Sequence, residues 1–237
     1  MILKTAIITG ASSGIGAATA KLLNKNGYNV VLAARRIEKL DVLSKELDVN
    51  HHIVQTDVTQ VADVERLVKE SIEKFGAIDV LVNNAGLGMV APMHEGKLED
   101  WHKMFNVNVN GLLSCIHKAL PHLLKSEGTV INIASVAAHE VFPNTVVYCA
   151  TKHAVNAITI GMRKEFRDKV KVCNISPGAV QTEFLEQSAV NEQTKQMKDY
   201  FFNNETLQSE DIAEAILDVL SKPKRVAINE VIIRPNL

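Results

Sequence analysis

Short apolar runs alternate with longer amphipathic stretches along almost the whole chain, and this alternation most constrains the fold. The short runs are typical of buried strands and lie at 2–8, 29–34, 53–55, 78–82, 129–134, 170–175 and 230–233. The longer stretches indicate helices at 17–26, 37–47, 61–75, 98–125, 147–167 and 210–220. Repeated strand–helix units predict an α/β fold, a doubly wound parallel sheet with helices on both faces. Because no linker-like segment interrupts the 237 residues, we expect a single domain over 1–237.

Composition excludes several classes of function. A net charge of −1 and the lack of a basic run argue against a nucleic-acid partner. No apolar run is long enough to span a membrane and no secretory signal opens the chain, so we expect no membrane partner. Three isolated cysteines, Cys115, Cys149 and Cys173, fit a reducing, cytoplasmic location. The eight histidines lack the spacing of metal ligands, so no metal site is expected.

The turn between the first strand and the first helix is rich in glycine. Gly10, Gly14 and Gly16 have the spacing Gly-x-x-x-Gly-x-Gly. A glycine-rich strand-to-helix turn lets the backbone approach a pyrophosphate, whose charge meets the N-terminus of the helix. The turn therefore indicates a dinucleotide site, with a tight turn that binds no ligand as the alternative.

The end of the second strand favours one of the two nicotinamide dinucleotides. Sites for NAD carry an acidic residue there for the ribose hydroxyls. This chain instead has Ala33-Ala34-Arg35-Arg36. Two cations at the start of a helix are unfavourable with its dipole unless an anion joins them. The 2′-phosphate of NADP suits arginine, so we expect NADP(H) rather than NAD(H). Two solvated arginines are the alternative.

Tyr148 and Lys152 are four residues apart, so in a helix they share one face. A neighbouring ammonium favours the phenolate and lowers the pKa of a tyrosine, which then exchanges protons near neutral pH. Ser135 can supply a second hydrogen bond to the same substrate oxygen. The alternative for an isolated pair is a tyrosine at the core edge beside a solvated lysine.

The candidate residues follow different strands but are expected to meet. The glycine turn, Asp57, Asn84–Gly86, Ser135 and Pro177–Gly178 each come directly after a predicted strand. In an open parallel sheet, ligands bind outside the carboxyl ends of the strands. One edge of the sheet should therefore carry both the dinucleotide and the reacting groups.

Taken together, these motifs resemble the short-chain dehydrogenase/reductase family over essentially the whole chain. They lie at 9–16, 57–58, 83–86, 108–111, 135, 148–152 and 177–182. The resemblance implies a Rossmann fold and reversible hydride transfer between NADP(H) and a small ketone or aldehyde, with Tyr148 as the acid and base. A non-catalytic NADPH-binding sensor on the same fold is the alternative.

The resemblance also implies a role for each matching residue. The catalytic set would be Asn108, Ser135, Tyr148 and Lys152. Asp57 is alternatively a helix cap, and Asn108 is alternatively a polar residue that kinks the long helix. The cofactor-binding set would be Gly10, Ser12, Ser13, Gly14, Ile15, Gly16, Arg35, Arg36, Asp57, Val58, Asn84, Ala85, Gly86, Tyr148, Lys152, Pro177, Gly178, Val180 and Thr182.

Two departures from common family patterns refine the expectation. Ser13 stands where many NADP-using members have a cation, so the phosphate would depend on Arg35 and Arg36. The tail 226–235 resembles the NADP-dependent branch that contains serine/3-hydroxy acid dehydrogenases and clavulanic aldehyde-type reductases.

The substrate is expected among 87–93, 136–142 and 183–202, the last acting as a lid. Within the second of these segments, His139 is the polar exception among mostly apolar residues, and a solvated loop histidine is the favoured alternative for it. Family members commonly pair through their long helices, so a homo-oligomer, either a tetramer or a dimer, is the expected assembly.

Overall fold

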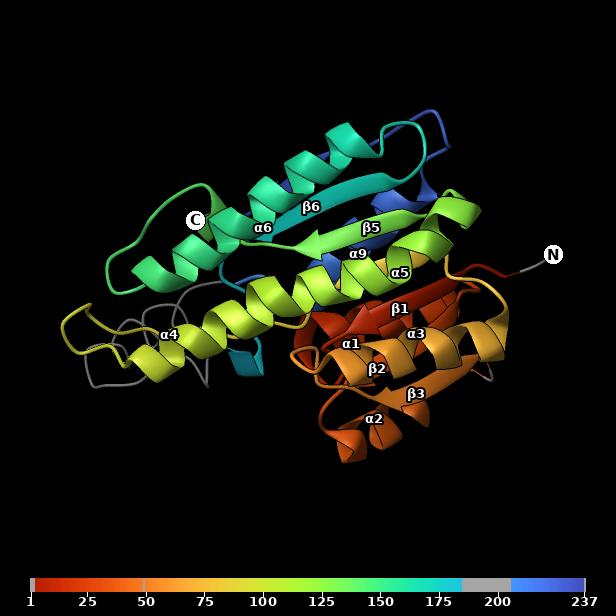
Figure 1. Ribbon diagram of the computed structural model, residues 1–237, viewed down its shortest axis with the longest axis horizontal. Coiled ribbons are helices and arrows are strands. Elements are labelled where there is room, and N and C mark those ends of the chain that lie inside the picture. Colours follow the sequence, from red (N-terminus) through yellow and green to blue (C-terminus); the bar gives the residue numbers. More distant parts are fainter. Residues whose placement is uncertain (1–2, 49, 185–205, 237) are drawn as a thin grey trace.

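A computed structural model describes residues 3–48, 50–184 and 206–236 and is built around one parallel sheet (Figure 1). The sheet has seven strands in the order β3-β2-β1-β4-β5-β6-β7. The direction of winding changes between β1 and β4, which is where such sheets bind ligands. The strands are β1 (Thr5–Thr9), β2 (Asn29–Ala34), β3 (His51–Gln55), β4 (Val80–Asn83), β5 (Thr129–Ile133), β6 (Lys171–Pro177) and β7 (Glu230–Ile233).

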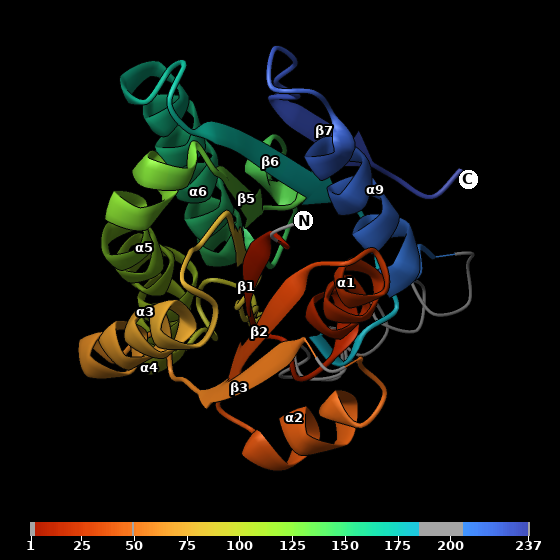
Figure 2. The same ribbon diagram turned by 90° about the vertical axis from the view of Figure 1, so that its right-hand side faces the viewer.

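Helices cover both faces of the sheet, as Figure 2 shows. One face packs against α3 (Val61–Phe75), α5 (Leu112–Ser126) and α6 (Val146–Glu165). The other packs against α1 (Gly14–Lys25), α2 (Ile37–Ser44) and α9 (Ser209–Ser221). Successive strand residues supply the two cores alternately: Ile7 enters the first, whereas Ala6 and Ile8 enter the second. The expected doubly wound α/β fold is confirmed.

The long helix expected at 98–125 is interrupted. It consists of α4 (Leu98–Phe105), a π-helical segment η1 (Asn106–Gly111) and α5. A π-helical turn holds an extra residue and often marks a functional position. Elsewhere the bounds shift by a few residues: α2 ends at Ser44 rather than 47, and β6 extends to Pro177.

Several features predicted from the sequence lie away from the strand ends, and the structure bears on each of them. None of the helices in the described residues is long and apolar enough to cross a membrane. The three cysteines are free and buried. Within the same residues, no group of three or more His, Cys, Asp or Glu side chains is placed to hold a metal ion. The expected lid at 183–202 lies outside the described residues, except for Glu183 and Phe184.

Candidate active site

A cavity of about 820 Å³ opens at the carboxyl ends of the strands and brings the predicted site residues together. This volume suits a bound cofactor with its substrate. Gly16 and Asn108 are the two predicted residues that do not line it, and both lie directly behind its wall. Those that line it are Gly10, Ser12, Ser13, Gly14, Ile15, Arg35, Arg36, Asp57, Val58, Asn84, Ala85, Gly86, Ser135, Tyr148, Lys152, Pro177, Gly178, Val180 and Thr182.

The glycine turn folds tightly on itself at the start of α1. Gly10 has a positive φ of 66°, a conformation that disfavours side chains. A Cβ atom on Gly16 would lie 2.4 Å from the Gly10 carbonyl oxygen, so only glycine fits there. Ser13 is the N-cap of α1, yet its side chain makes no capping hydrogen bond. The first turn of α1 therefore offers backbone donors to an anion.

Asn84 braces this turn from the neighbouring strand. Its Nδ2 donates to the carbonyl oxygens of Thr9 (2.9 Å) and Gly10 (3.2 Å). The Thr9 hydroxyl in turn accepts hydrogen bonds from the backbone N–H groups of Asn84 and Ala85, both at 3.0 Å. These contacts clamp β1 to β4 where the winding reverses. Asn84 thus shapes the cavity wall as well as lining it.

Asp57 caps a turn while it faces the cavity. Its Oδ1 accepts from the backbone N–H of Thr59 (2.9 Å) and from the Thr59 hydroxyl (2.8 Å). The Asp57 N–H donates to Asp63 Oδ2, and this bond lowers the pKa of Asp63. Asp57 therefore closes a turn rather than capping a helix, because the N-cap of α3 is Gln60. The Asp57 residue also lines the cavity beside Val58.

Two further charged residues, Glu183 and Lys39, lie beside Arg36, and neither is among the residues predicted from the sequence to bind the cofactor. The Arg36 guanidinium donates to the hydroxyls of Ser12 (3.0 Å) and Ser13 (2.9 Å). It also pairs with Glu183 Oε2 at 2.8 Å, and Lys39 pairs with the other oxygen of the same carboxylate. Lys39 lies one helical turn beyond Arg36, a spacing that could have identified it. Arg35 is exposed at the cavity rim.

The cavity also holds the proposed reacting groups Ser135, Tyr148 and Lys152. They come from the end of β5 and from α6, whereas Arg35 and Arg36 follow β2, three strands away in the sheet. Burial raises the pKa of Tyr148 to about 12, although a hydrogen bond with the Ser135 side chain opposes the rise. Burial also lowers the pKa of Lys152 to about 8. The Lys152 ammonium lies 5.8 Å from the centre of the Tyr148 ring and donates to the Ile133 carbonyl oxygen at 2.8 Å. The lowered tyrosine pKa expected from the sequence was wrong, because desolvation dominates the pKa of the buried phenol.

The π-helical segment turns Asn108 toward this group. Asn108 is 2% exposed, and its side chain exchanges two 2.8 Å hydrogen bonds with the backbone of Leu87. Its Nδ2 also donates to the Thr151 hydroxyl at 3.0 Å. A Cβ atom on Gly86 would lie 3.4 Å from Asn108 Oδ1 and 3.8 Å from Lys152 Nζ. Asn108 and Lys152 therefore both lie close to Gly86.

The wall around Tyr148 is mostly apolar. The Phe184 ring lies 5.8 Å from the Tyr148 ring, centre to centre, at a tilt of 52°. Gly88 lies against them, and a Cβ atom there would lie 2.7 Å from the end of the Phe184 ring. Other lining residues that the motifs did not single out are Leu87, Val90, Val107, Phe142, Pro143, Asn144 and Pro235.

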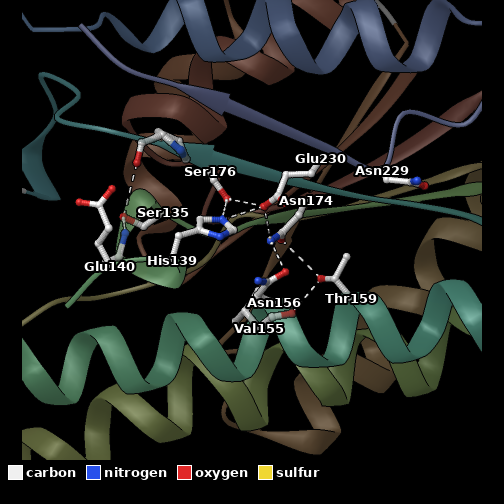
Figure 3. A network of polar contacts seen from close by, with 12 residues as sticks. Ser135, His139, Glu140, Val155, Asn156, Thr159, Asn174, Ser176, Asn229 and Glu230 are labelled. Carbon is white, nitrogen blue, oxygen red and sulfur yellow. Dashed lines mark hydrogen bonds and ion pairs between the residues drawn. The ribbon is translucent and has the colours of Figure 1, made fainter.

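His139 lies in an exposed turn, as the solvated-loop alternative has it, but its ring has partners in the protein. Figure 3 shows the ring beside Ser176 and Glu230, with Nε2 2.8 Å from Glu230 Oε1 and 3.3 Å from Ser176 Oγ. The contact ties the loop that follows Ser135 to β7. Behind it, a row of in-register polar residues crosses β4 to β7: Asn83, Asn132, Asn174 and Glu230.

Comparison with known proteins agrees with this arrangement. The family model described as short chain dehydrogenase matches residues 4–193. An uncharacterized oxidoreductase of Staphylococcus saprophyticus subsp. saprophyticus is 41% identical over 240 residues, covering 98% of this chain and 96% of the relative.

Solved structures agree as well. A serine dehydrogenase complexed with NADP+ is 32% identical with a TM-score of 0.91, covering 98% of this chain and 94% of that one. An alcohol dehydrogenase of Thermococcus sibiricus, complexed with 5-hydroxy-NADP, is also 32% identical with a TM-score of 0.88, covering 99% and 97%. Other similar structures hold NAD or NADH. The chain is therefore an oxidoreductase of the short-chain dehydrogenase/reductase family.

Proposed function

We propose that this oxidoreductase uses NADP(H) to interconvert small, largely apolar ketones or aldehydes with their alcohols. The observation that carries the proposal is that Ser135, Tyr148 and Lys152 line the same cavity as the glycine turn and Arg35 and Arg36. One continuous space thus offers proton-transfer groups at one end and phosphate-binding groups at the other.

The donor set fits a phosphorylated dinucleotide. The glycine turn brings backbone donors at the start of α1 into the cavity, which suits a pyrophosphate. Arg36 reaches the two serine hydroxyls of that turn, which places cations and neutral donors together for a further phosphate. Asp57 and Val58 would hold the adenine. Pro177, Gly178, Val180 and Thr182 would hold the nicotinamide.

The residues at the other end suit carbonyl chemistry. When bound, the nicotinamide supplies or accepts the hydride at the substrate carbon. Tyr148 is neutral at physiological pH, since burial raises its pKa still further, to about 12, and it would donate its proton to the substrate oxygen. Ser135 would donate a hydrogen bond to the same oxygen as charge develops on it. Lys152 would bind the ribose beside the nicotinamide, and Asn108 would hold the Leu87 backbone in place behind it.

The lining favours apolar substrates. Leu87, Val90, Phe142 and Phe184 form much of the wall near Tyr148. Arg234 also lines the cavity, and its guanidinium pairs with Glu140. The apolar wall favours neutral ketones and aldehydes over hydroxy acids.

Turnover with a panel of small ketones and aldehydes tests the proposal. NADPH consumption should be seen with at least one apolar carbonyl, and Tyr148→Phe should lower kcat by about 10²–10⁴-fold while NADPH still binds. Binding of NADPH without consumption across the panel would favour the sensor alternative. Turnover unchanged in Tyr148→Phe would remove Tyr148 from the chemistry.

Assembly into a homo-oligomer is part of the proposal. Exposed large apolar side chains lie along α4 to α6, among them Phe105, Leu113, Val146 and Ile160. Their outward position is consistent with pairing of the long helices between copies. The mass of the purified protein in solution, measured by light scattering, would show a dimer or tetramer if this is correct and a monomer if it is not.

A further inference from the structure

Glu183 places a carboxylate among the cations that the proposed function assigns to the phosphate. One of its oxygens lies 2.8 Å from Arg36 Nη1, and the other pairs with Lys39. Glu183 lies 147 residues from Arg36 in the sequence and follows Thr182 at the end of the β6 loop. It lines the same cavity as Ser12, Ser13 and Arg36.

This carboxylate is an anion held in a site built for anions. Hydrogen bonds from Lys39 and Arg36 hold the pKa of Glu183 below its usual range, so it is charged at neutral pH. The group is also easily displaced, because the three side chains remain 36–39% exposed. Exposed ion pairs contribute little to stability, so a stronger anion can replace the carboxylate at small cost.

NADP and NAD differ at the 2′ position of the adenosine ribose, the group that Arg36 and Lys39 are proposed to face. NADP carries a 2′-phosphate, whose charge and three oxygens would compete with the carboxylate for Arg36 and Lys39. NAD carries a 2′-hydroxyl, which NAD sites bind through an acidic residue at the end of the second strand. That acid is missing here, where the strand ends in Ala33 and Ala34.

We propose that Glu183 is an internal anion in the 2′-phosphate seat and thereby sets the discrimination between NADP(H) and NAD(H). With NADP(H), the carboxylate leaves Arg36 and Lys39 to the phosphate. With NAD(H), it stays and accepts a hydrogen bond from the ribose hydroxyl. Lys39 is then the third cation of the seat, beside Arg35 and Arg36. The inference rests on the proposed dinucleotide site but not on which dinucleotide the wild type prefers.

Glu183→Gln tests the inference through the dissociation constants of NADPH and NADH, measured by fluorescence titration. The amide keeps the shape of the side chain but no longer competes as an anion. NADPH should bind about three- to tenfold more tightly, since two exposed ion pairs need not be broken. NADH should bind equally or more weakly, because an amide is a poorer acceptor than a carboxylate. The ratio of the two constants should therefore shift toward NADPH.

Lys39→Met separates competition from a general charge effect. In the wild type, Lys39 gives up the Glu183 carboxylate for the 2′-phosphate when NADPH binds. In the Glu183→Gln variant, Lys39 has no carboxylate to give up and only gains the phosphate. The Lys39→Met substitution should therefore lower the affinity for NADPH more in Glu183→Gln than in the wild type. A double-mutant cycle over Glu183 and Lys39 should therefore give a coupling that is absent for NADH.

A matched control removes one carboxylate from an ion pair away from the cavity. Glu46 pairs with Lys21 at 2.6 Å on the surface, so Glu46→Gln changes the net charge equally. In Glu46→Gln, the ratio of the NADPH and NADH dissociation constants should equal that of the wild type. The inference would be overturned if this ratio were unchanged in Glu183→Gln, or if Glu46→Gln shifted it as much. A wild type that prefers NADH would overturn only the proposed NADP(H) preference, because the Glu183→Gln shift is read independently.

Discussion

At the scale of single residues, burial sets the protonation of the proposed catalytic pair. A pKa of about 12 keeps Tyr148 protonated through the neutral range, ready to donate in the direction of reduction. A pKa of about 8 means that Lys152 loses its charge as the solution becomes moderately alkaline. The two groups therefore lose their protons in the order lysine, then tyrosine, as pH rises.

A pH profile follows from that order. The kcat/KM for carbonyl reduction should stay level below about pH 8 and fall above it, by about tenfold per unit where the charge of Lys152 is essential. Alcohol oxidation needs the Tyr148 phenolate, so its kcat/KM should instead gain from rising pH until the loss of Lys152 offsets it. Steady-state rates in both directions over pH 6–10 (roughly the usable range) check this. A reduction limb that rises with pH would contradict the assignment.

The two arginines should differ when they are changed separately. Arg36 supports the glycine turn through Ser12 and Ser13, so Arg36→Ala should weaken both NADPH and NADH. Arg35 is exposed at the rim, so Arg35→Ala should weaken NADPH by about 10-fold or more and leave NADH nearly unchanged. Titration of both variants with both dinucleotides gives the four constants. Equal losses for NADPH and NADH in Arg35→Ala would show that Arg35 binds no phosphate.

Sequence reasoning at this scale found the motif residues but not their partners. Arg35 and Arg36 were evident because a strand end without an acid is itself a signal. Glu183 was not, since nothing local links it to a residue 147 positions away. The raised pKa of Tyr148 was missed for a related reason: the spacing of Tyr148 and Lys152 reports their proximity, whereas burial depends on the packed loops around them.

At the scale of elements, the π-helical segment η1 does what an uninterrupted helix could not. It directs Asn108 into the protein, where the side chain satisfies both backbone polar groups of Leu87. The spacing of apolar residues predicted a single helix over 98–125. A π-helical turn is invisible to such a pattern, because its extra residue changes the backbone hydrogen bonds without removing the apolar face of the helix. The family pattern points to Asn108, which is buried, whereas Asn110, two residues further along η1, is exposed.

Asn108→Ala should therefore affect folding as well as activity. Its removal leaves partly buried backbone groups of Leu87 without these partners, and each such group costs up to about 1–3 kcal/mol. Urea denaturation should show the free energy of unfolding reduced by about 1–3 kcal/mol. Asn110→Ala is the control, because the exposed Asn110 side chain donates to Asn106 Oδ1 at 3.0 Å within η1 itself. Similar losses in the two variants would mean that Asn108 has no special place in the segment.

At the scale of the whole molecule, the order of the strands explains why the sequence predicted the location of the site so well. Residues that follow β1, β3, β4, β5 and β6 lie far apart in the chain, yet parallel pairing brings all these strand ends to one edge. That argument needs only the alternation of strands and helices. The shape of the cavity wall could not be predicted in this way, because Asn144 and Pro235 reach it from loops whose paths no periodicity describes.

A ligand that spans this edge contacts segments that unfolding would separate, so it should stabilise the fold as a whole. At about 100 times its dissociation constant, NADPH should add about 2.7 kcal/mol to the free energy of unfolding. For a domain of this size that corresponds to a rise in Tm of about 5–10 °C. Differential scanning fluorimetry at matched concentrations should give a smaller rise with NADH if the phosphate seat is real.

The same measurement separates binding from chemistry. Tyr148→Phe, whose hydroxyl is proposed to act on the substrate, should keep most of the NADPH-dependent rise in Tm while losing turnover. Arg35→Ala should reduce the difference between NADPH and NADH, because part of the extra stabilisation comes from the contact of Arg35 with the 2′-phosphate. If NADPH left the Tm of the wild type unchanged at saturating concentration, the cavity at this edge would not be a dinucleotide site. The catalytic roles proposed for Ser135, Tyr148 and Lys152 would then lack the cofactor they require.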